Sequence, residues 1–353
     1  MYSTCIIGAS GYTGAELIAL VNAHPLFTLS ACFVSENSSD ANKAISEVHP
    51  HLTQVTSSDA NELHLQALNA EALSRTANDF DLIFLATPHE ASHDWADSLI
   101  RGKAKVFDLS GAFRISDTAI FAEYYGFEHK QKELLSEAVY GLAEWHEEQI
   151  ARASFVAVPG CYPTASLLAL KPLADAGVVD SKQRPVINAT SGVSGAGKKP
   201  SATTNFFEVS LQAYGVLGHR HTPEIEEYAN TKVIFTPHLG QFKRGILATV
   251  TVAIKDGVSA DDIDALYINK YASSDIVRLR KQWPKIDDVA HTPFCDLHWK
   301  FDENSRYLVV TSVIDNLLKG AASQALQCAN IASGLHSATG LLPSFMTTAT
   351  AKK

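Results

Sequence analysis

Three evenly spaced glycines near the N-terminus separate a short apolar run from a stretch of good helix formers. Residues 4–7 favour a strand and residues 15–21 favour a helix, with Gly8, Gly11 and Gly14 between them. Glycines at such a corner permit a tight turn, a close backbone approach to a pyrophosphate and close packing of helix on strand. The alternative is a glycine turn needed for packing alone. The order strand, glycine turn, helix favours a dinucleotide-binding unit.

The rest of the first half alternates strand-like and helical segments. Residues 28–34, 81–86 and 104–108 favour strands, and residues 91–100 carry a helical pattern. Such alternation predicts a parallel, doubly wound sheet of the Rossmann type. Ligands of such a sheet bind at the carboxyl ends of its strands.

Residues 35–43 follow the second strand, where a dinucleotide site recognises the ribose of the cofactor. Glu36 can accept a hydrogen bond from a ribose 2′-hydroxyl, which favours NAD. Ser35, Ser38 and Lys43 can instead hold a 2′-phosphate, which favours NADP. The residues themselves leave both cofactors open.

A cysteine lies at a predicted corner in the middle of the chain. Residues 155–158 favour a short buried strand, Pro159-Gly160 indicates a turn, and Pro163 opens a helical run. Cys161 would therefore lie at a helix N-terminus, where the helix dipole favours a thiolate. A nucleophile and a buried structural cysteine are both compatible with this position.

Arg114 ends a loop, residues 109–114, that follows the strand at 104–108. Its guanidinium is suited to binding a phosphate or a carboxylate at the carboxyl edge of the sheet. A solvated surface arginine is the alternative.

Two short motifs resemble those of other enzyme classes but lack parts that those classes need. Residues 89–93 read H-E-x-x-H, yet they directly follow a strand and Pro88, and no downstream H-x-x-G-x-x-H offers a third zinc ligand. We therefore expect no metal. Residues 192–198 approach the phosphate-binding pattern of nucleoside triphosphatases, but Lys199 replaces the hydroxyl residue that binds magnesium. The glycines of this loop still leave backbone amides able to approach an anion or a cofactor.

The second half has a different pattern. Residues 232–236, 245–254 and 306–314 are rich in β-branched residues and predict a mixed or antiparallel sheet with one covered face, a surface that often forms a subunit interface. Residues 261–271 favour a helix. Thr222 is placed as the N-cap of another helix, with Pro223 at its first position, and His219, Arg220 and His221 lie immediately before that helix. Histidine is the usual acid/base partner of a cysteine near neutral pH.

Composition narrows the class of protein. A net charge of −9 and a pI near 5.8 argue against nucleic acid or an anionic membrane as partner. Five scattered cysteines without C-x-x-C spacing favour reduced thiols and a cytoplasmic location. We see no secretory signal and no run long enough to span a membrane.

Five segments together resemble the family of N-acetyl-gamma-glutamyl-phosphate reductase, the NADP-dependent enzyme of arginine biosynthesis that is related to aspartate-semialdehyde dehydrogenase. They are Gly8-Ala-Ser-Gly-Tyr-Thr-Gly14, Val158-Pro-Gly-Cys-Tyr-Pro-Thr164, Ser191-Gly-Val-Ser-Gly-Ala-Gly197, His219-Arg-His-Thr-Pro-Glu224 and Asn316-Leu-Leu-Lys-Gly-Ala-Ala322. The resemblance extends from residue 4 to about residue 331, and the block around Cys161 is its most specific part.

The resemblance implies a set of functional residues. It makes Cys161 the nucleophile and His221 the acid/base, with His219 as the other candidate. It implies that the substrate contacts Arg114, His219, Arg220, Ser194 and Gly195. It implies that NADP(H) contacts Gly8, Ser10, Gly11, Tyr12, Thr13, Gly14, Ser35, Ser38 and Asn316. Glu36 departs from the family, since many relatives carry an arginine near this position.

The resemblance also implies the chemistry. Cys161 would attack the acyl phosphate of N-acetylglutamyl phosphate, release inorganic phosphate and form a thioester, which hydride from NADPH reduces to the semialdehyde. The alternatives are an enzyme like aspartate-semialdehyde dehydrogenase that acts on another acyl phosphate, and an NADP-binding regulator without catalysis. A homodimer or homotetramer is expected.

The predicted organisation is a Rossmann-like doubly wound, mostly parallel domain followed by an α+β domain with a mixed or antiparallel sheet. Residues 1–155 form the NADP-binding domain, which a C-terminal helix at 316–335 completes. Residues 156–315 form the catalytic and oligomerisation domain. Residues 346–353 are expected to be a flexible tail.

Overall fold

The computed structural model describes residues 1–53 and 63–342 of the chain, so the predicted tail lies outside the described residues. The chain forms two compact units, which are described separately. Unit 1 comprises residues 1–116, 129–159 and 321–353, and unit 2 comprises residues 117–128 and 160–320. Residues 117–128, which the sequence placed in the first domain, thus group with unit 2.

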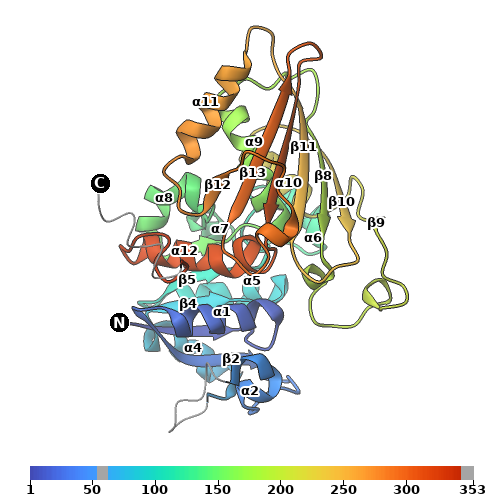
Figure 1. Cartoon of the computed structure of the whole chain (residues 1–353). Coiled ribbons are helices and arrows are strands. Elements are labelled where there is room, and N and C mark those ends of the chain that lie inside the picture. The colour runs from blue at the N-terminus through green and yellow to red at the C-terminus, as the bar shows by residue number, and fades with distance from the viewer. Residues whose placement is uncertain (54–62, 343–353) are drawn as a thin grey trace. The chain divides into compact units, whose positions relative to one another are not determined.

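Unit 1 is built on a seven-stranded sheet in the order β3-β2-β1-β4-β5-β7-β6, and all of its pairings are parallel. Figure 1 labels β2, β4 and β5 of this sheet. The strands are β1 (Tyr2–Ile7), β2 (Phe27–Ser35), β3 (Leu65–Leu68), β4 (Leu82–Leu85), β5 (Lys105–Asp108), β6 (Val139–Tyr140) and β7 (Phe155–Ala157). The order reverses at β1, with β2 on one side and β4 on the other. This arrangement confirms the predicted doubly wound sheet, and it places the glycine turn after β1 at the point of reversal, where such sheets bind their ligands.

The helices of unit 1 follow the strands as the alternating pattern predicted. They are α1 (Tyr12–Ala23), α2 (Ile45–Val48), α4 (Ala70–Asp79), α5 (His89–Ile100), α7 (Lys132–Glu137), α8 (Ala143–Arg152) and α12 (Ser323–Ala332), with a 3₁₀ turn η1 (Pro50–Leu52). On one face of the sheet, α4 and α5 pack over apolar side chains of the strands. Late in the chain, α12 packs against β5, α8 and α1.

The C-terminal helical region starts later than residue 316. A π-helical turn, η5 (Leu318–Ala322), leads into α12. The Asp315 carboxylate accepts hydrogen bonds from the amides of Leu317 and Leu318 at 2.9 and 3.1 Å, and so it satisfies amides at the start of the turn. The helical region therefore begins at Leu318, two residues after the predicted start.

Unit 2 contains a seven-stranded mixed sheet in the order β12-β13-β14-β11-β8-β10-β9. Its strands are β8 (Val186–Ser191), β9 (Gln212–Ala213), β10 (Ile234–Leu239), β11 (Ile246–Ala253), β12 (Val277–Leu279), β13 (Cys295–Asp302) and β14 (Tyr307–Ile314). Two pairings, β8 with β10 and β12 with β13, are parallel, and the others are antiparallel. The sheet is mixed, as the sequence predicted.

Four helices accompany this sheet: α6 (Thr118–Tyr125), α9 (Cys161–Asp175), α10 (His221–Ala229) and α11 (Ala260–Tyr271). The central helix is α9, which packs on β11 and β14 and contacts α10 and α11. Hydrogen bonds at 2.6 Å from the hydroxyls of Tyr267 and Tyr271 to backbone carbonyls of Ala169 and Leu168 hold α11 on α9. The first residue of this well-anchored helix is Cys161.

The described helices include none that is both long and apolar enough to cross a bilayer.

Candidate functional site

Cys161 is the first residue of α9, so the helix starts two residues before the predicted Pro163. Gly160 precedes it in an extended conformation. The Gly160 carbonyl accepts hydrogen bonds at 2.9 Å from both the backbone amide and the hydroxyl of Thr164. This turn fixes the backbone of the cysteine, and the N-terminus of a 15-residue helix favours the thiolate over the thiol.

Cys161 differs in environment from the other four cysteines. Cys5, Cys32, Cys295 and Cys328 are buried, whereas Cys161 is half-buried and lines a cavity. Burial raises the pKa of Cys32 to about 12 and raises the pKa of Cys5 well above its usual value. Burial therefore keeps Cys5 and Cys32 in their thiol form, whereas Cys161 has the accessible position that a nucleophile needs.

The turn before Cys161 is held from a second helix. The Glu224 carboxylate is fully buried, and its Oε1 accepts a hydrogen bond from the backbone amide of Gly160 at 2.8 Å. Glu224 lies on α10, one turn after His221. One carboxylate therefore links the helix that carries the histidine to the turn that carries the cysteine. The sequence placed Glu224 at a helix start but assigned it no role.

Gly320 is close to Cys161. A methyl group added at Gly320 would lie 2.8 Å from the Cβ of Cys161, a separation that real Cβ atoms essentially never show. The π-helical turn can therefore approach the cysteine only with glycine at this position.

His219 and His221 lie together, with ring centroids 4.9 Å apart. The backbone amide of His221 donates a hydrogen bond to Nδ1 of His219 at 3.1 Å, so Nδ1 of His219 carries no proton and acts as an acceptor. Burial, with Arg220 beside it, lowers the pKa of His219 to about 4. His219 is therefore neutral near pH 7, and its side chain accepts a hydrogen bond from the first backbone amide of α10.

This arrangement corrects the predicted N-cap. Thr222 is the second residue of α10, and its backbone amide donates to the carbonyl oxygen of His219 at 2.8 Å. The Thr222 hydroxyl is buried and caps nothing. The threonine prediction was wrong because the helix begins one residue earlier, at His221, with Arg220 as the N-cap residue.

Cys161 and residues 219–221, which we call the basic segment, share one cavity of about 470 Å³ in unit 2. Predicted site residues in its lining are Cys161, Gly195, His219, Arg220 and His221. The lining also includes Gly192 and Ala196 from the predicted glycine loop. Residues without a predicted role in the lining are Tyr124, Tyr162, Ser191, Thr203, Gln212, Tyr214, Gly215, Gly218 and Leu239. The exposed Arg220 has no ion pair within the described part of the chain, so its charge is available to an anionic ligand.

Two tyrosines contribute hydroxyl groups beside this cavity. The Tyr214 hydroxyl donates to the Tyr162 hydroxyl at 3.1 Å, which in turn donates to the His238 carbonyl at 3.1 Å. Burial raises the pKa of both phenols, so both stay protonated. The only sequence signal for Tyr162 was its position next to Cys161.

The glycine loop after β8 forms a short 3₁₀ helix, η2 (Val193–Ala196). Asn316 is buried, and its side-chain amide donates to the Ser194 hydroxyl at 3.0 Å and accepts from the Gly245 backbone amide at 2.6 Å. Both polar ends of the Asn316 side chain thus bond within unit 2. Gly192 is needed for packing, because a methyl group added there would lie 2.7 Å from the backbone nitrogen of Arg244.

Arg114 belongs to unit 1 and is buried. Its Nε donates to the Val158 carbonyl at 2.7 Å, and its Nη2 donates to the Leu109 carbonyl at 2.7 Å. The arginine thus supports the end of the strand that leads to Cys161. Arg114 is therefore not a solvated surface arginine, since only 5% of the residue is exposed.

The glycine turn of unit 1 has the geometry of a dinucleotide site. Gly8 has φ +91°, and an added methyl group would lie 2.2 Å from the Ala86 carbonyl oxygen. A methyl group at Gly14 would lie 2.5 Å from the Gly8 carbonyl oxygen, whereas one at Gly11 would make only an ordinary contact of 3.6 Å with the same oxygen. Gly11 caps α1, which presents the positive end of its dipole and its first amides, those of Tyr12 and Thr13. Ser10 lies within the same turn. These residues fit a pyrophosphate.

The residues that would distinguish NADP from NAD lie in a turn after β2. The Ser38 amide donates to the Ser35 carbonyl at 2.9 Å, and the Asp40 amide donates to the Ser38 hydroxyl at 3.2 Å. Lys43 forms an ion pair with Asp40 at 2.9 Å, and Glu36 is exposed. The turn therefore presents one free acid and one paired lysine, which leaves both cofactors open.

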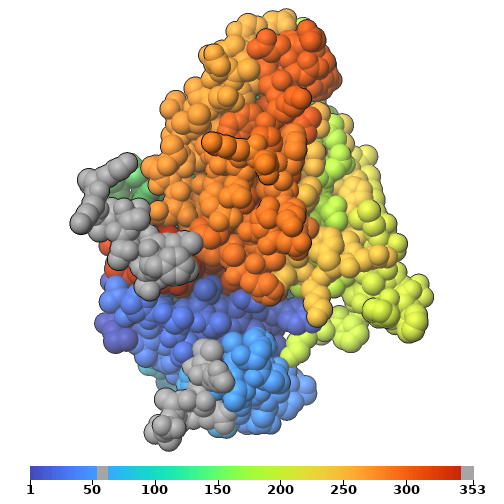
Figure 2. Space-filling view, viewed as in Figure 1, coloured from blue at the N-terminus to red at the C-terminus, as the bar shows by residue number. Residues whose placement is uncertain are grey.

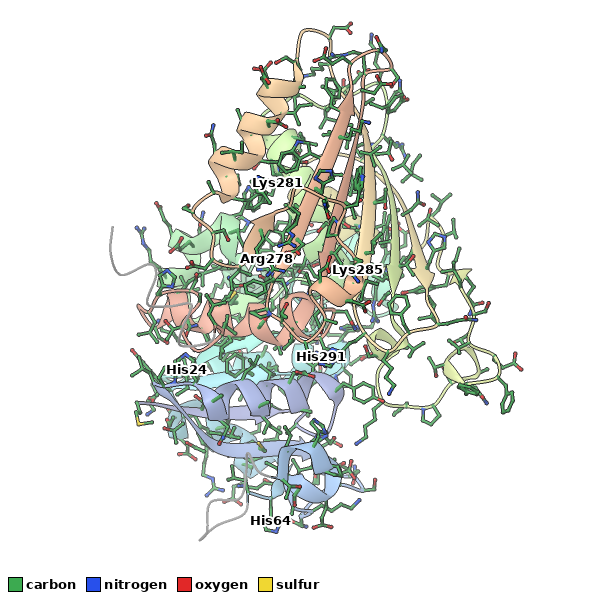
Figure 3. The ribbon with its side chains drawn as sticks, in the orientation of Figure 1. His24, His64, Arg278, Lys281, Lys285 and His291 are labelled. Carbon is green, nitrogen blue, oxygen red and sulfur yellow. The ribbon has the colours of Figure 1, made fainter. Side chains whose placement is uncertain are left out.

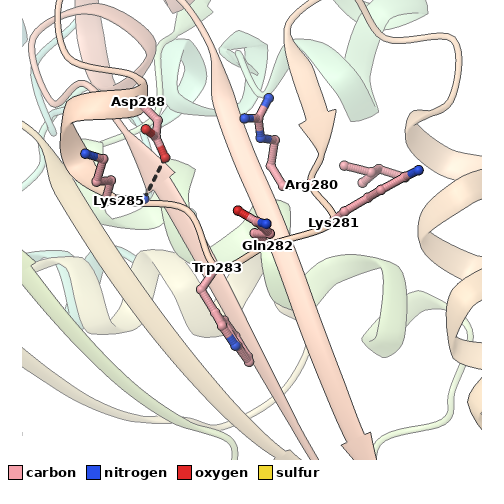
Figure 4. A pocket seen from close by; sticks show the side chains of 7 residues that line it. Arg280, Lys281, Gln282, Trp283, Lys285 and Asp288 are labelled. Atoms are coloured by element: carbon pink, nitrogen blue, oxygen red, sulfur yellow. Dashed lines mark hydrogen bonds between the residues drawn. The ribbon is translucent and has the colours of Figure 1, made fainter.

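Another cavity of unit 2, of about 620 Å³, lies beside the segment that follows β12 (Figure 4). Its lining includes Arg280, Lys281, Trp283 and Lys285, and Figure 3 shows Arg278 nearby. In Figure 4, Lys281 and Lys285 extend in opposite directions, so their charges do not converge on one ligand. This cavity contains neither a thiol nor an imidazole in its lining.

The H-E-x-x-H residues serve the fold of unit 1. The His89 Nδ1 accepts a hydrogen bond from the Gly111 amide at 2.7 Å, and the His93 Nε2 accepts one from the Lys130 amide at 3.0 Å. Within residues 1–53 and 63–342, no group of three or more metal-binding side chains gathers.

Comparison with known proteins identifies both units. The family description "Semialdehyde dehydrogenase, NAD binding domain" matches residues 3–153, and "Semialdehyde dehydrogenase, dimerisation domain" matches residues 161–316. Among solved structures, aspartate semialdehyde dehydrogenase II from Vibrio cholerae has a TM-score of 0.70 at 17% identity and covers 95% of this chain and 98% of its own. This likeness shows the shared fold.

Curated relatives are much more similar in sequence. N-acetyl-gamma-glutamyl-phosphate reductase of Alteromonas mediterranea is 64% identical over 97% of this chain and 100% of its own length. The protein of the same name from Pseudoalteromonas atlantica is 57% identical over 97% of this chain and 98% of its own length. The chain therefore belongs to the N-acetyl-gamma-glutamyl-phosphate reductase family.

Proposed function

We propose that the protein reduces N-acetyl-L-glutamyl 5-phosphate to N-acetyl-L-glutamate 5-semialdehyde in arginine biosynthesis, with NADPH as reductant and a thioester on Cys161 as intermediate. The observation that carries this proposal is the shared cavity of Cys161 and His221, with the thiol at a helix N-terminus. The names of relatives that are 52% to 64% identical supply the substrate.

The first half-reaction transfers the acyl group to the protein. His221 accepts the proton of the Cys161 thiol, and the thiolate attacks the carbonyl carbon of the acyl phosphate. The new carbon–sulfur bond forms, the bond from carbon to the phosphate oxygen breaks, and inorganic phosphate leaves. The thioester then holds the acyl group on Cys161.

The second half-reaction reduces this thioester. NADPH bound at the glycine turn after β1 would supply the hydride that this reduction needs. His221 donates a proton to the oxyanion that hydride addition leaves on the former carbonyl oxygen, which gives the thiohemiacetal. As the carbon–sulfur bond breaks, His221 takes this proton back, the semialdehyde leaves, and the Cys161 thiolate is regenerated. We assign this role to His221 because the Nδ1 of His219 is already an acceptor and the low pKa of His219 keeps it neutral.

Arg220 is the residue that we assign to the negative charges of the substrate, because it lines the cavity without an ion pair in the described part of the chain. Gly195 lines the same cavity, and Ser194 precedes it in η2, so both remain substrate contacts in this proposal. The phosphate-binding role of Arg114 stays a prediction of the family resemblance, since two of its donors already bond to backbone carbonyls.

The cofactor assignment has two parts, the binding of a dinucleotide and the choice of NADP(H) as that dinucleotide. Residues 3–153 match an NAD-binding domain, and the turn at Gly8, Gly11 and Gly14 fits a dinucleotide pyrophosphate. We propose NADP(H) as the dinucleotide, with contacts from Ser10, Tyr12, Thr13, Ser35, Ser38 and Asn316. The Ser35–Ser38 turn supports a 2′-phosphate through its hydroxyl groups.

The proposed organisation follows the two units. Unit 1 binds the cofactor, and unit 2 contains the nucleophile and forms the contact between subunits of a homodimer or homotetramer, in keeping with the dimerisation domain matched at 161–316. We place the protein in the cytoplasm, with small molecules and inorganic phosphate as ligands and with no nucleic acid or membrane partner.

The reverse reaction tests this function. Wild-type protein should reduce NADP when N-acetylglutamate semialdehyde and inorganic phosphate are both present, and Cys161→Ser should lower the rate by about 10³-fold or more. Comparable turnover of aspartate semialdehyde would contradict the proposed substrate. NADP binding without turnover of either aldehyde would favour a regulator.

A further inference from the structure

A stretch of unit 2 between η2 and α10 exposes large apolar side chains. Phe206 is 85% exposed, Phe207 is 90% exposed, and Leu211, Val216 and Leu217 are each more than half exposed. We call residues 206–217 the apolar segment. Exposed apolar residues scattered over a surface are ordinary, but five in twelve residues form a concentrated patch that usually marks an interaction site.

The backbone of the apolar segment maintains this exposure at a cost. Leu217 has φ +58°, in the left-handed region that costs a leucine about 1–2 kcal/mol. Its side chain is 67% exposed, so packing within the described chain does little to offset this cost. A strained residue that presents an apolar side chain to solvent indicates a contact made outside the monomer.

The strand within the segment is also unpaired on one side. The last strand of the sheet is β9, Gln212–Ala213, which pairs only with β10. Figure 1 shows the chain around β9 extending away from the other strands of the same sheet, and Figure 2 shows its yellow-green atoms standing out from the surface. An exposed edge beside an apolar patch is a place where another chain can pair or pack.

The charge distribution favours a second copy as the occupant. Within residues 200–218, Glu208 is the only charged residue, although the whole chain carries a net charge of −9. Two copies of an acidic chain repel each other least where their surfaces are uncharged. An uncharged apolar patch also suits a two-fold contact, in which the same surface must be complementary to itself. The segment falls within the matched dimerisation domain, residues 161–316.

The same segment supplies part of the wall of the Cys161 cavity. Gln212, Tyr214 and Gly215 line that cavity, and the Tyr214 hydroxyl bonds to the Tyr162 hydroxyl. A contact that immobilises the apolar segment would therefore also fix this wall.

We propose that a second copy of this chain docks on the apolar segment, with Phe206 and Phe207 of each copy in the contact, and that this contact fixes the wall of the Cys161 cavity. The inference rests on the proposed homo-oligomer and specifies where its subunits meet and why the site depends on them.

The test is a double variant, Phe206→Ser with Phe207→Ser, and its matched control is Ile268→Ser, which removes a half-exposed apolar side chain from α11. Sedimentation velocity over a range of concentrations should show at least tenfold weaker association for the double variant and unchanged association for the control. KM for the acyl phosphate should rise as the double variant is diluted. Addition of more protein should reverse this rise.

The outcomes separate the two levels of the proposal. Wild-type protein that sediments as a monomer would overturn both the homo-oligomer and the docking surface. Wild-type oligomers together with an equally associated double variant would overturn the docking surface alone. Turnover by wild-type protein is measured independently and decides the proposed function.

A second measurement applies if the double variant fails to fold. Phe207→Cys is treated with a bismaleimide, with wild-type protein as the control, because four native cysteines are buried and only Cys161 is half-buried. Covalent dimers that form only with Phe207→Cys support the docking surface. Equal yields of dimer from both proteins, or none from either, would overturn it.

Discussion

The carboxylate of Glu224 and the backbone amide of Gly160 form a buried hydrogen bond of 2.8 Å. This bond joins α10, which begins with His221, to the turn that precedes Cys161. The acid/base and the nucleophile are thus attached to two helices that share one buried polar contact. Their relative position depends on a side chain that does not line the cavity itself.

Glu224→Ala should weaken both folding and catalysis, because it leaves the Gly160 amide buried without its acceptor. We expect a loss of about 1–3 kcal/mol in the free energy of unfolding, measured by urea denaturation, and a reduced kcat. Glu224→Gln keeps an oxygen acceptor and should recover most of both. Equal damage from the two substitutions would show that the charge, and not the hydrogen bond, matters.

The two histidines of the basic segment should differ in their effect on the pH profile. The pKa of His219 is lowered to about 4 by burial and by Arg220, so His219 does not change its charge between pH 5 and 8. His219→Asn should leave the pH dependence of kcat/KM near neutrality in place, even where the rate falls. His221→Asn should remove it. If His219→Asn instead removed the pH dependence of kcat/KM near neutral pH, the acid/base role would belong to His219.

Unit 1 should lose stability in mild acid because of His129. Burial, with His93 next, lowers the pKa of His129 from 6.5 to about 4, and its Nε2 donates to the Ala112 carbonyl. Between these two values the unfolded chain binds a proton that the folded chain does not. The stabilising contribution is therefore complete above pH 6.5 and is lost as the pH falls towards 4.

Urea midpoints between pH 4 and 7 measure this effect. His129→Gln keeps a donor for Ala112 but cannot titrate, so its midpoint should depend less on pH than that of the wild type. Parallel pH dependence of the two proteins would exclude His129 as the cause.

Gly320→Ala should impair catalysis more than folding. The new methyl group would lie 2.8 Å from Cβ of Cys161, so the π-helical turn or the cysteine must shift. A displacement of about 1 Å at a reacting group can lower the rate by about 10²-fold. Steady-state kcat and the melting temperature should be measured together. An unchanged kcat would mean that the turn adjusts without moving the nucleophile.

Local patterns predicted the elements that carry the site. The run at 155–158, the Pro159-Gly160 turn and the following helical run placed Cys161 at a helix start because each feature acts within a few residues. The glycine turn after β1 was predictable for the same reason, since strand, turn and helix are consecutive.

Contacts between distant residues were not predictable in this way. Glu224 and Gly160 are 64 positions apart, and Asn316 and Ser194 are 122 positions apart. Thr222 had the usual residue type of an N-cap, yet the helix begins one residue before it, and the amide of His221, the first of α10, donates to the imidazole of His219. Such contacts depend on how distant parts of the chain pack together, and this packing cannot be predicted from local patterns in a single sequence.

The central claim is that Cys161 carries the acyl group between the two half-reactions. Wild-type protein mixed with N-acetylglutamyl phosphate in the absence of NADPH should release phosphate in an amount equal to the protein. Mass spectrometry should find the N-acetylglutamyl group on the peptide that contains Cys161, and Cys161→Ser should show neither result. An unmodified Cys161 in wild-type protein that turns over normally once NADPH is added would contradict the thioester mechanism.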